Sequence, residues 1–249
     1  MSAAAARAFW FACQDPGRPI NVYKCGSLLA ANFNMLWAQA LNMQRGGVPI
    51  KYFAMLHDDI GAQDYWLDTL IEELEREELD VLGVVVPIKD GTGLTSIAMA
   101  SDDDSPWRIH GRLTMQEIHQ LPETFTSEDV GRPLLLNSGC WVCRFDPAWN
   151  KKVHFTINDR IVFNATTDRY EVEVESEDWY FSRLLHENHL RIGATRKVAI
   201  AHRGSIDFGN ELPWGEWSHD KAFLSASSLP PRLENPNPAV EPALVLSEV

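Results

Sequence analysis

Cysteine, positive charge and long hydrophobic runs are all scarce in this sequence, and each scarcity excludes a class of protein. Four cysteines in 249 residues are too few for a secreted scaffold held together by disulfides. The chain has 22 Lys and Arg against 35 Asp and Glu, a formal net charge of −13. That balance argues against broad binding to nucleic acid or to an anionic membrane surface. No run approaches the roughly 20 apolar residues that span a bilayer.

Linkers and targeting signals are scarce as well. No stretch rich in Gly, Ser or Pro interrupts about the first 220 residues, so we expect one domain over residues 1–224. Too few apolar residues follow Arg7 to form the core of a signal peptide, and a cytoplasmic protein without a membrane span is expected. Residues 225–249 are Pro-rich and show no periodicity, which predicts a disordered tail.

Apolar runs that alternate with amphipathic stretches predict an α/β fold. Three runs read as strands that are buried on both faces, namely residues 8–13, 50–56 and 81–86. Two helical patterns separate them, at residues 28–43 and 66–74. Strand–helix–strand order predicts a mostly parallel sheet between two layers of helices. Residues 87–133 are expected to be irregular apart from a short helix near residues 114–119.

Cys140 and Cys143 form a CxxC motif inside an apolar stretch that reads as a strand. Residues three apart on a strand point to opposite faces of the sheet. The pair is therefore a poor zinc site and a poor redox site, and we expect two buried thiols.

The stretch most suggestive of function is the apolar run at residues 53–56, which leads directly into His57, Asp58 and Asp59. Adjacent carboxylates repel each other, so their placement at a strand end favours a bound cation. Two acids after a strand also simply cap a helix. In open α/β sheets, binding sites form at the carboxyl ends of the strands.

Two further polar clusters follow apolar elements. One is Ser176-Glu177-Asp178, and the other is His202-Arg203-Gly204. The first also fits an ordinary helix N-terminus with Ser176 as its N-cap, because serine favours that position and acids in the first turn are favoured by the helix dipole. A single histidine at a strand end is commonly a hydrogen-bonded structural residue.

The order of these motifs resembles that of GT-A-fold glycosyltransferases that use nucleotide sugars. Leu56-His57-Asp58-Asp59 is similar to the family's short acidic motif, and the resemblance covers about residues 8–210. Other stretches that resemble family motifs are Trp66-Leu67-Asp68-Thr69-Leu70, Asn137-Ser138-Gly139, Ser176-Glu177-Asp178-Trp179 and His202. The resemblance implies a GT-A-like three-layer α/β/α sandwich with a mostly parallel central sheet. It also implies a nucleotide-binding half at about residues 1–90 and an acceptor half at about residues 91–224.

The resemblance further implies a metal-dependent transfer of a sugar from a nucleotide-diphosphate donor, with a UDP-sugar as the first candidate. Asp59 and His202 would hold Mn²⁺ or Mg²⁺, with Asp58 as a further ligand or nearer the sugar. Oxygen and imidazole ligands suit these ions. The donor would contact Gln14, His57, Asp58 and Gly139.

For an inverting reaction, Asp178 is the first candidate for the general base and Glu177 the second. For a retaining reaction, the acid would position the acceptor or the sugar. Trp179 and Trp141 are candidates for stacking on the acceptor, which would be a glycan, a small molecule or, as in phage-type enzymes, a modified DNA base. A sugar-nucleotide pyrophosphorylase and a non-catalytic binding module remain alternatives. Residues 13–18 lack the Gly-rich basic loop that the pyrophosphorylase needs.

Overall fold

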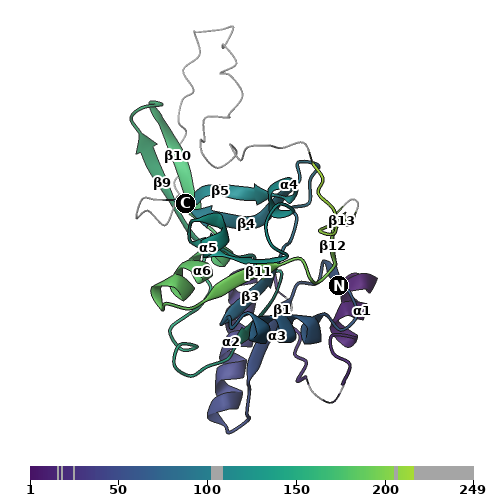
Figure 1. Ribbon diagram of the computed structural model, residues 1–249. Helices are drawn as coiled ribbons and strands as arrows, with labels where there is room; N and C mark the ends of the chain where they lie inside the picture. Colours follow the sequence, from purple (N-terminus) through teal and green to yellow (C-terminus); the bar gives the residue numbers. More distant parts are fainter. Residues whose placement is uncertain (16, 18, 25, 102–108, 205–206, 216–249) are drawn as a thin grey trace, which may run out of the picture.

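The structure is a computed structural model that describes the chain except residues 16, 18, 25, 102–108, 205–206 and 216–249 (Figure 1). The tail expected at residues 225–249 therefore lies outside the described residues. The helices are α1 (Ala3–Trp10), α2 (Leu29–Arg45), α3 (Trp66–Arg76), α4 (Met115–Ile118), α5 (Ser127–Val130) and α6 (Glu177–Glu187). The strands are β1 (Tyr52–Leu56), β2 (Ile60–Ala62), β3 (Val81–Val84), β4 (Leu94–Ala100), β5 (Ile109–Thr114), β6 (Thr124–Thr126), β7 (Leu134–Leu135), β8 (Cys140–Arg144), β9 (Asn158–Asn164), β10 (Arg169–Glu175), β11 (Ile192–Thr195), β12 (Ile200–Arg203) and β13 (Asp207–Gly209).

The central sheet has five strands in the order β1-β8-β3-β11-β6, and it is mostly antiparallel. Only β3 and β11 run parallel, whereas β8 is antiparallel to both of its neighbours and β6 is antiparallel to β11. The expected mostly parallel GT-A-like sandwich is therefore wrong. An apolar run such as residues 81–86 predicts a strand covered on both faces, and it carries no information about the direction of the neighbouring strand.

Two hydrophobic cores lie on opposite faces of this sheet. Alternate residues of β8 enter different cores, because successive side chains of a strand point to opposite faces. Trp141 and Cys143 join the core under α2 and α6, whereas Cys140 and Val142 join the core under α1 and α3. The prediction that Cys140 and Cys143 are buried thiols on opposite faces is confirmed.

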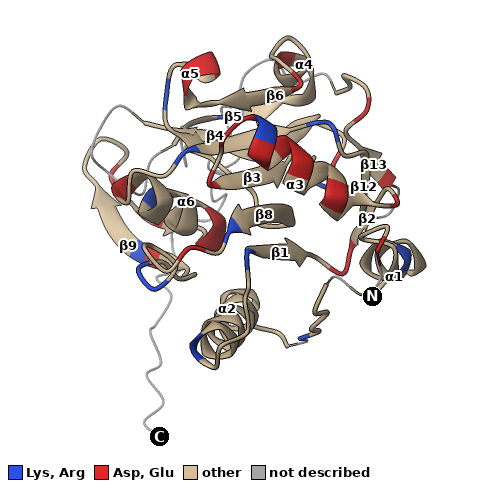
Figure 2. Ribbon diagram, turned by 60° about the horizontal axis from the view of Figure 1, so that its bottom comes forward, with Lys and Arg blue, Asp and Glu red and all other residues tan. Residues whose placement is uncertain are grey.

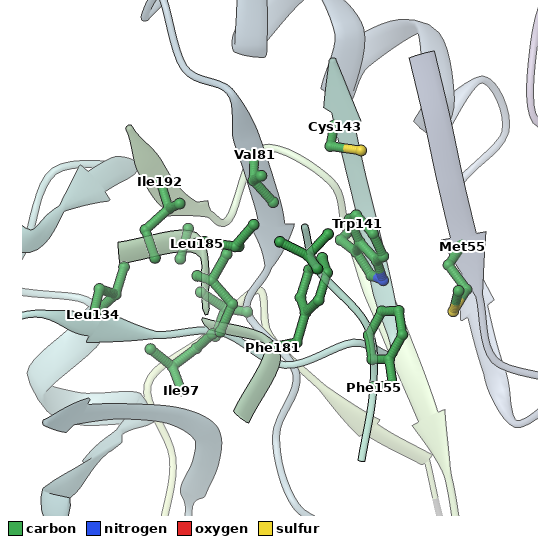
Figure 3. Packing of buried hydrophobic residues seen from close by; sticks show 14 of the residues in the cluster. Met55, Val81, Ile97, Leu134, Trp141, Cys143, Phe155, Phe181, Leu185 and Ile192 are labelled. Carbon is green, nitrogen blue, oxygen red and sulfur yellow. The ribbon is translucent and has the colours of Figure 1, made fainter. Parts of the chain in front are cut away.

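The larger core is rich in aromatic rings. Trp141, Phe155 and Phe181 lie against one another between β8 and α6 (Figure 3). The rings of Phe155 and Phe181 stack with their centroids 4.3 Å apart, and Trp37 of α2 closes the cluster from the other side. The Trp37 indole N–H donates to the Asn150 carbonyl over 2.8 Å, so this polar group is satisfied within the core.

The first predicted strand is instead a helix. Residues 8–13 were expected to be extended, but α1 occupies residues 3–10, and the chain turns after it. The reason lies before the apolar run, because Ser2 accepts from the Ala5 amide as an N-cap and the following alanines have high helix propensity. The other predicted strands and helices are present with shifted ends. Asp64, just before α3, pairs with Arg7 of α1.

The middle of the chain is more regular than expected. Residues 87–133 contain β4, β5 and β6 and two short helices that begin with capping boxes at Thr114 and Thr126. The strands β5-β4-β7 form one small antiparallel sheet and β13-β12-β2 form another. The antiparallel hairpin of β9 and β10 extends away from the body (Figure 1). Figure 2 shows the acidic residues along the outer side of α3.

Three connections place the polar clusters near one another. The small sheet pairs β12 with β2, which sets His202 opposite Ile60, directly after the acids that follow β1. The chain enters β8 through residues 137–139, and Cys140 lies opposite Leu56 at the end of β1. The hairpin leads into α6, whose first turn holds Asp178.

Candidate functional site

Asp59 and His202 meet where β2 and β12 pair. The His202 Nε2 atom lies 3.5 Å from the Asp59 Oδ2 atom, and the Arg203 amide donates to the Asp59 carbonyl over 2.8 Å. On its other side, the His202 Nδ1 atom lies 2.7 Å from the Pro87 carbonyl oxygen. A carbonyl only accepts, so Nδ1 donates its proton to Pro87, and this contact fixes the ring with Nε2 facing the Asp59 carboxylate.

A lysine also reaches this carboxylate. The Lys89 ammonium lies 2.5 Å from the Asp59 Oδ2 atom, the same oxygen that faces His202. The hydrogen bond from His202, together with the Lys89 ammonium, holds the pKa of the Asp59 carboxyl well below its ordinary value. The second carboxylate oxygen, Asp59 Oδ1, is buried, and no described residue hydrogen-bonds it.

His57 lies on the inner side of this pair. Its ring stacks on Phe33 of α2, with the centroids 5.2 Å apart. Burial lowers the pKa of His57 to about 4, so the imidazole is neutral near pH 7. Its Nε2 atom is buried and has no hydrogen-bond partner among the described residues. His57 Nε2 and Asp59 Oδ1 are thus two buried polar atoms without partners among the described residues, and a bound ligand or water molecule is one explanation for such atoms.

The other predicted contacts around the acids lie further out. The Asp58 side chain is 58% exposed and its carboxylate lies 3.6 Å from the amino group of Met1. The backbone N–H of Gln14 donates to the Asp68 carboxylate in the first turn of α3 over 2.7 Å. In the described structure no hydrogen bond joins Gln14 to Asp59 or His202, so the fold groups His57 and Asp59 with His202 but not Gln14.

The turn at residues 137–139 joins the acids to the second cluster. The His57 amide donates to the Gly139 carbonyl over 2.8 Å, and the Gly139 amide donates to the Asn137 side chain over 2.7 Å. Glycine leaves room here, because a Cβ at position 139 would lie 2.6 Å from both the Ile60 side chain and the Asn137 oxygen. The backbone of the turn is thereby fixed against the end of β1.

Asp178 lies on the other side of the same turn. Its carboxylate accepts from the Ser138 hydroxyl and, over 3.2 Å, from the Asn137 amide. Burial, reinforced by the neighbouring charge of Glu177, raises the pKa of Asp178 to about 7. Ser176 accepts from the Trp179 amide over 3.5 Å, which confirms the predicted N-cap. Asp178 thus exchanges its proton near neutral pH, as a general base requires, while Glu177 acts on it through charge.

The two predicted stacking residues are covered. Trp141 is 2% exposed and Trp179 is 7% exposed. Trp141 borders a small cavity beside Asp178 and Ser138 that has room for about one water molecule. The Arg112 guanidinium lies over the Trp179 ring, 5.0 Å from its centroid. Neither ring presents a free face to a sugar in this conformation.

Asp59 and His202 are the two residues of this site that could serve as metal ligands. Asp59 and His202 supply one oxygen and one nitrogen, and Asp59 Oδ1 and His57 Nε2 lie buried beside them without partners among the described residues. Within the described ranges, no group of three or more His, Cys, Asp and Glu is arranged to hold a metal. The pair alone therefore forms no complete metal site, and a cation bound there would need further oxygen ligands from phosphate or water.

Sequence reasoning missed Lys89 and the direct contacts of Asp178 with Ser138 and Asn137. Lys89 follows β3 as the acids follow β1, so the rule of strand carboxyl ends already pointed to it. The contact between Ser138 and Asp178 had no signal in the sequence, because the two residues are 40 positions apart in the chain.

No known protein family, curated protein or solved structure matches this chain. The resemblance of its motifs to glycosyltransferases is thus supported by no relative. No helix among the described residues combines the length and the hydrophobicity needed to cross a membrane.

Proposed function

We propose that this protein is a metal-dependent glycosyltransferase that moves a sugar from a nucleoside-diphosphate donor to an acceptor hydroxyl. The proposal does not require the GT-A fold, which the mostly antiparallel sheet contradicts, because function is argued from a site rather than from a fold. The observation that carries it is the His202 Nε2 atom, which the Pro87 carbonyl aims at the Asp59 carboxylate 3.5 Å away.

Asp59 and His202 would hold Mn²⁺ or Mg²⁺. A divalent cation in this position neutralises the charge of a departing diphosphate. The neutral His57 ring and the Gly139 turn border the same place and would contact the donor. These residues bind and orient, and they exclude water from one side of the site.

Asp178 is the proposed general base. Its pKa of about 7 lets the carboxylate accept a proton from an acceptor hydroxyl at neutral pH. The Asn137–Gly139 turn contacts both Asp178 and the end of β1, and in this proposal the acid would lie on the acceptor side of the acidic motif. The net charge of −13 favours a glycan or small-molecule acceptor over DNA.

The test is an Asp59→Asn variant compared with an Asp168→Asn control at the exposed tip of the hairpin. Asparagine tolerates the positive φ of position 168, so the control should fold and behave as the wild type does. Mn²⁺ binding and Mn²⁺-dependent hydrolysis of a panel of UDP-, GDP- and CMP-sugars are measured for each protein.

We expect Asp59→Asn to lose Mn²⁺ binding and to reduce donor hydrolysis by at least about a hundredfold. Unchanged hydrolysis in this variant would refute the metal assignment. Failure of the wild type to hydrolyse any of these donors in the presence of Mn²⁺ would refute the glycosyltransferase.

A further inference from the structure

The ammonium group of Lys89 occupies the position where the proposed function needs a cation. It lies 2.5 Å from Asp59 Oδ2, and the His202 Nε2 atom faces the same oxygen from 3.5 Å. The side chains of Lys89 and Asp59 are 38% and 34% exposed, so the pair is open to solvent and exchangeable.

The segment that carries Lys89 also fixes His202. The Pro87 carbonyl accepts from His202 Nδ1, and Lys89 follows two residues later in the connection from β3 to β4. The chain after β12 packs on the lysine stem, since a Cβ at Gly204 would lie 3.2 Å from the Lys89 Cβ. The stem is held at its base, while the ammonium end keeps the freedom of a flexible four-carbon chain.

We propose that Lys89 is a positioning residue that neutralises Asp59 in the free protein and contacts the donor diphosphate when the cation binds. This inference rests on the proposed function. Lys89 and a divalent cation compete for one carboxylate oxygen, so the lysine weakens binding of the metal alone. A diphosphate brings negative charge for the displaced ammonium, so the same lysine strengthens binding of the donor. The competition couples metal binding to donor binding.

The decisive comparison is between Lys89→Met and a Lys151→Met control on the exposed surface after β8. Two affinities are measured for each protein and for the wild type. The first is for Mn²⁺ alone, from the loss of the free-ion electron paramagnetic resonance signal. The second is for UDP at saturating Mn²⁺, by calorimetry.

In Lys89→Met we expect the affinity for Mn²⁺ alone to rise about fivefold, the size of a partly exposed ion pair. The affinity for UDP at saturating Mn²⁺ should fall about tenfold, since a charge-assisted contact to phosphate is lost. Lys151→Met should match the wild type in both. Opposite shifts for two ligands cannot arise from general damage to the fold, which would weaken both.

Lys89→Arg provides a second check, because it keeps the charge and should retain most of the UDP affinity. Equal affinities for both ligands in Lys89→Met and the wild type would overturn the role of Lys89 and leave the glycosyltransferase intact. Weaker binding of Mn²⁺ in Lys89→Met would also overturn it. Absence of Mn²⁺ and UDP binding in the wild type would overturn the proposed function and, with it, this inference.

Discussion

The backbone amide of His57 donates a hydrogen bond to the carbonyl of Gly139 over 2.8 Å. This contact joins the segment after β1, which includes Asp59, to the turn at residues 137–139. The same turn hydrogen-bonds Asp178 of α6. The proposed metal ligands and the proposed base come from distant parts of the chain, so their relative placement depends on this junction.

Gly139→Ala should loosen the junction. A Cβ at this position would lie 2.6 Å from the ends of the Ile60 and Asn137 side chains, so these side chains or the turn must shift. We expect a loss of about 1–3 kcal/mol in the free energy of unfolding, measured by urea denaturation. Gly91→Ala is the matched control, because a Cβ there meets nothing within 4 Å. Equal stability of the two variants would contradict the close packing of the turn.

Asp178→Asn should change how stability depends on pH. The folded carboxyl has a pKa of about 7 against an ordinary value of 3.8. The folded state therefore keeps a proton that the unfolded state releases, and the wild type loses stability as pH rises from about 4 to about 7. The variant lacks this loss. The difference in the free energy of unfolding between the variant and the wild type should shift in favour of the variant by at least about 1.4 kcal/mol from pH 4 to pH 8. That value corresponds to a pKa shift of about one unit. A pH-independent difference in urea denaturation would argue against a raised pKa.

Glu73→Gln should destabilise the junction between α3 and β11. Glu73 is 3% exposed, and it accepts from Arg76, from Lys197 over 2.8 Å and from Thr124. Burial alone would raise the pKa of Glu73, but these donors outweigh it and lower the pKa to about 2. We expect a loss of about 1–3 kcal/mol at pH 7.

The Glu73→Gln loss has a defined pH dependence. Because the folded pKa is depressed, the stabilisation by the carboxylate is present above pH 4.5 and disappears as pH falls toward 2. Glu72→Gln, on the exposed side of the same helix, should have no such effect. Chemical denaturation of both variants at pH 3 and pH 7 makes the comparison.

Phe181→Ala tests the aromatic core beneath the site. Phe181 is 4% exposed and stacks on Phe155, with the centroids 4.3 Å apart. Truncation should cost about 3–5 kcal/mol, because the cavity is lined by rigid rings. Phe163→Ala on the hairpin, where the side chain is 54% exposed, should cost less than about 0.5 kcal/mol. The free energy of unfolding of each variant is measured by thermal or urea denaturation. Similar losses of stability in both variants would contradict the burial of Phe181 in the core.

Local chemistry in the sequence predicted several parts of the structure correctly. The N-cap at Ser176 and the opposite faces of Cys140 and Cys143 were predicted from spacing and residue type alone. The acids after β1 were placed at a strand end by the same logic. Such features are decided within a few residues of chain, so the sequence carries them directly.

The direction of β8 and the meeting of Asp59, Lys89 and His202 are decided only by the tertiary structure. Strand direction depends on which connection brings a strand to its neighbour, and the apolar pattern of β8 is the same in either direction. The alanines before Phe9 turned an expected strand into α1, because helix propensity and a cap at Ser2 outweighed the apolar run. The sequence by itself determined which residues end strands and cap helices. Pairing between distant segments decided which of those ends share a site, since that choice depends on long-range packing and on no local pattern.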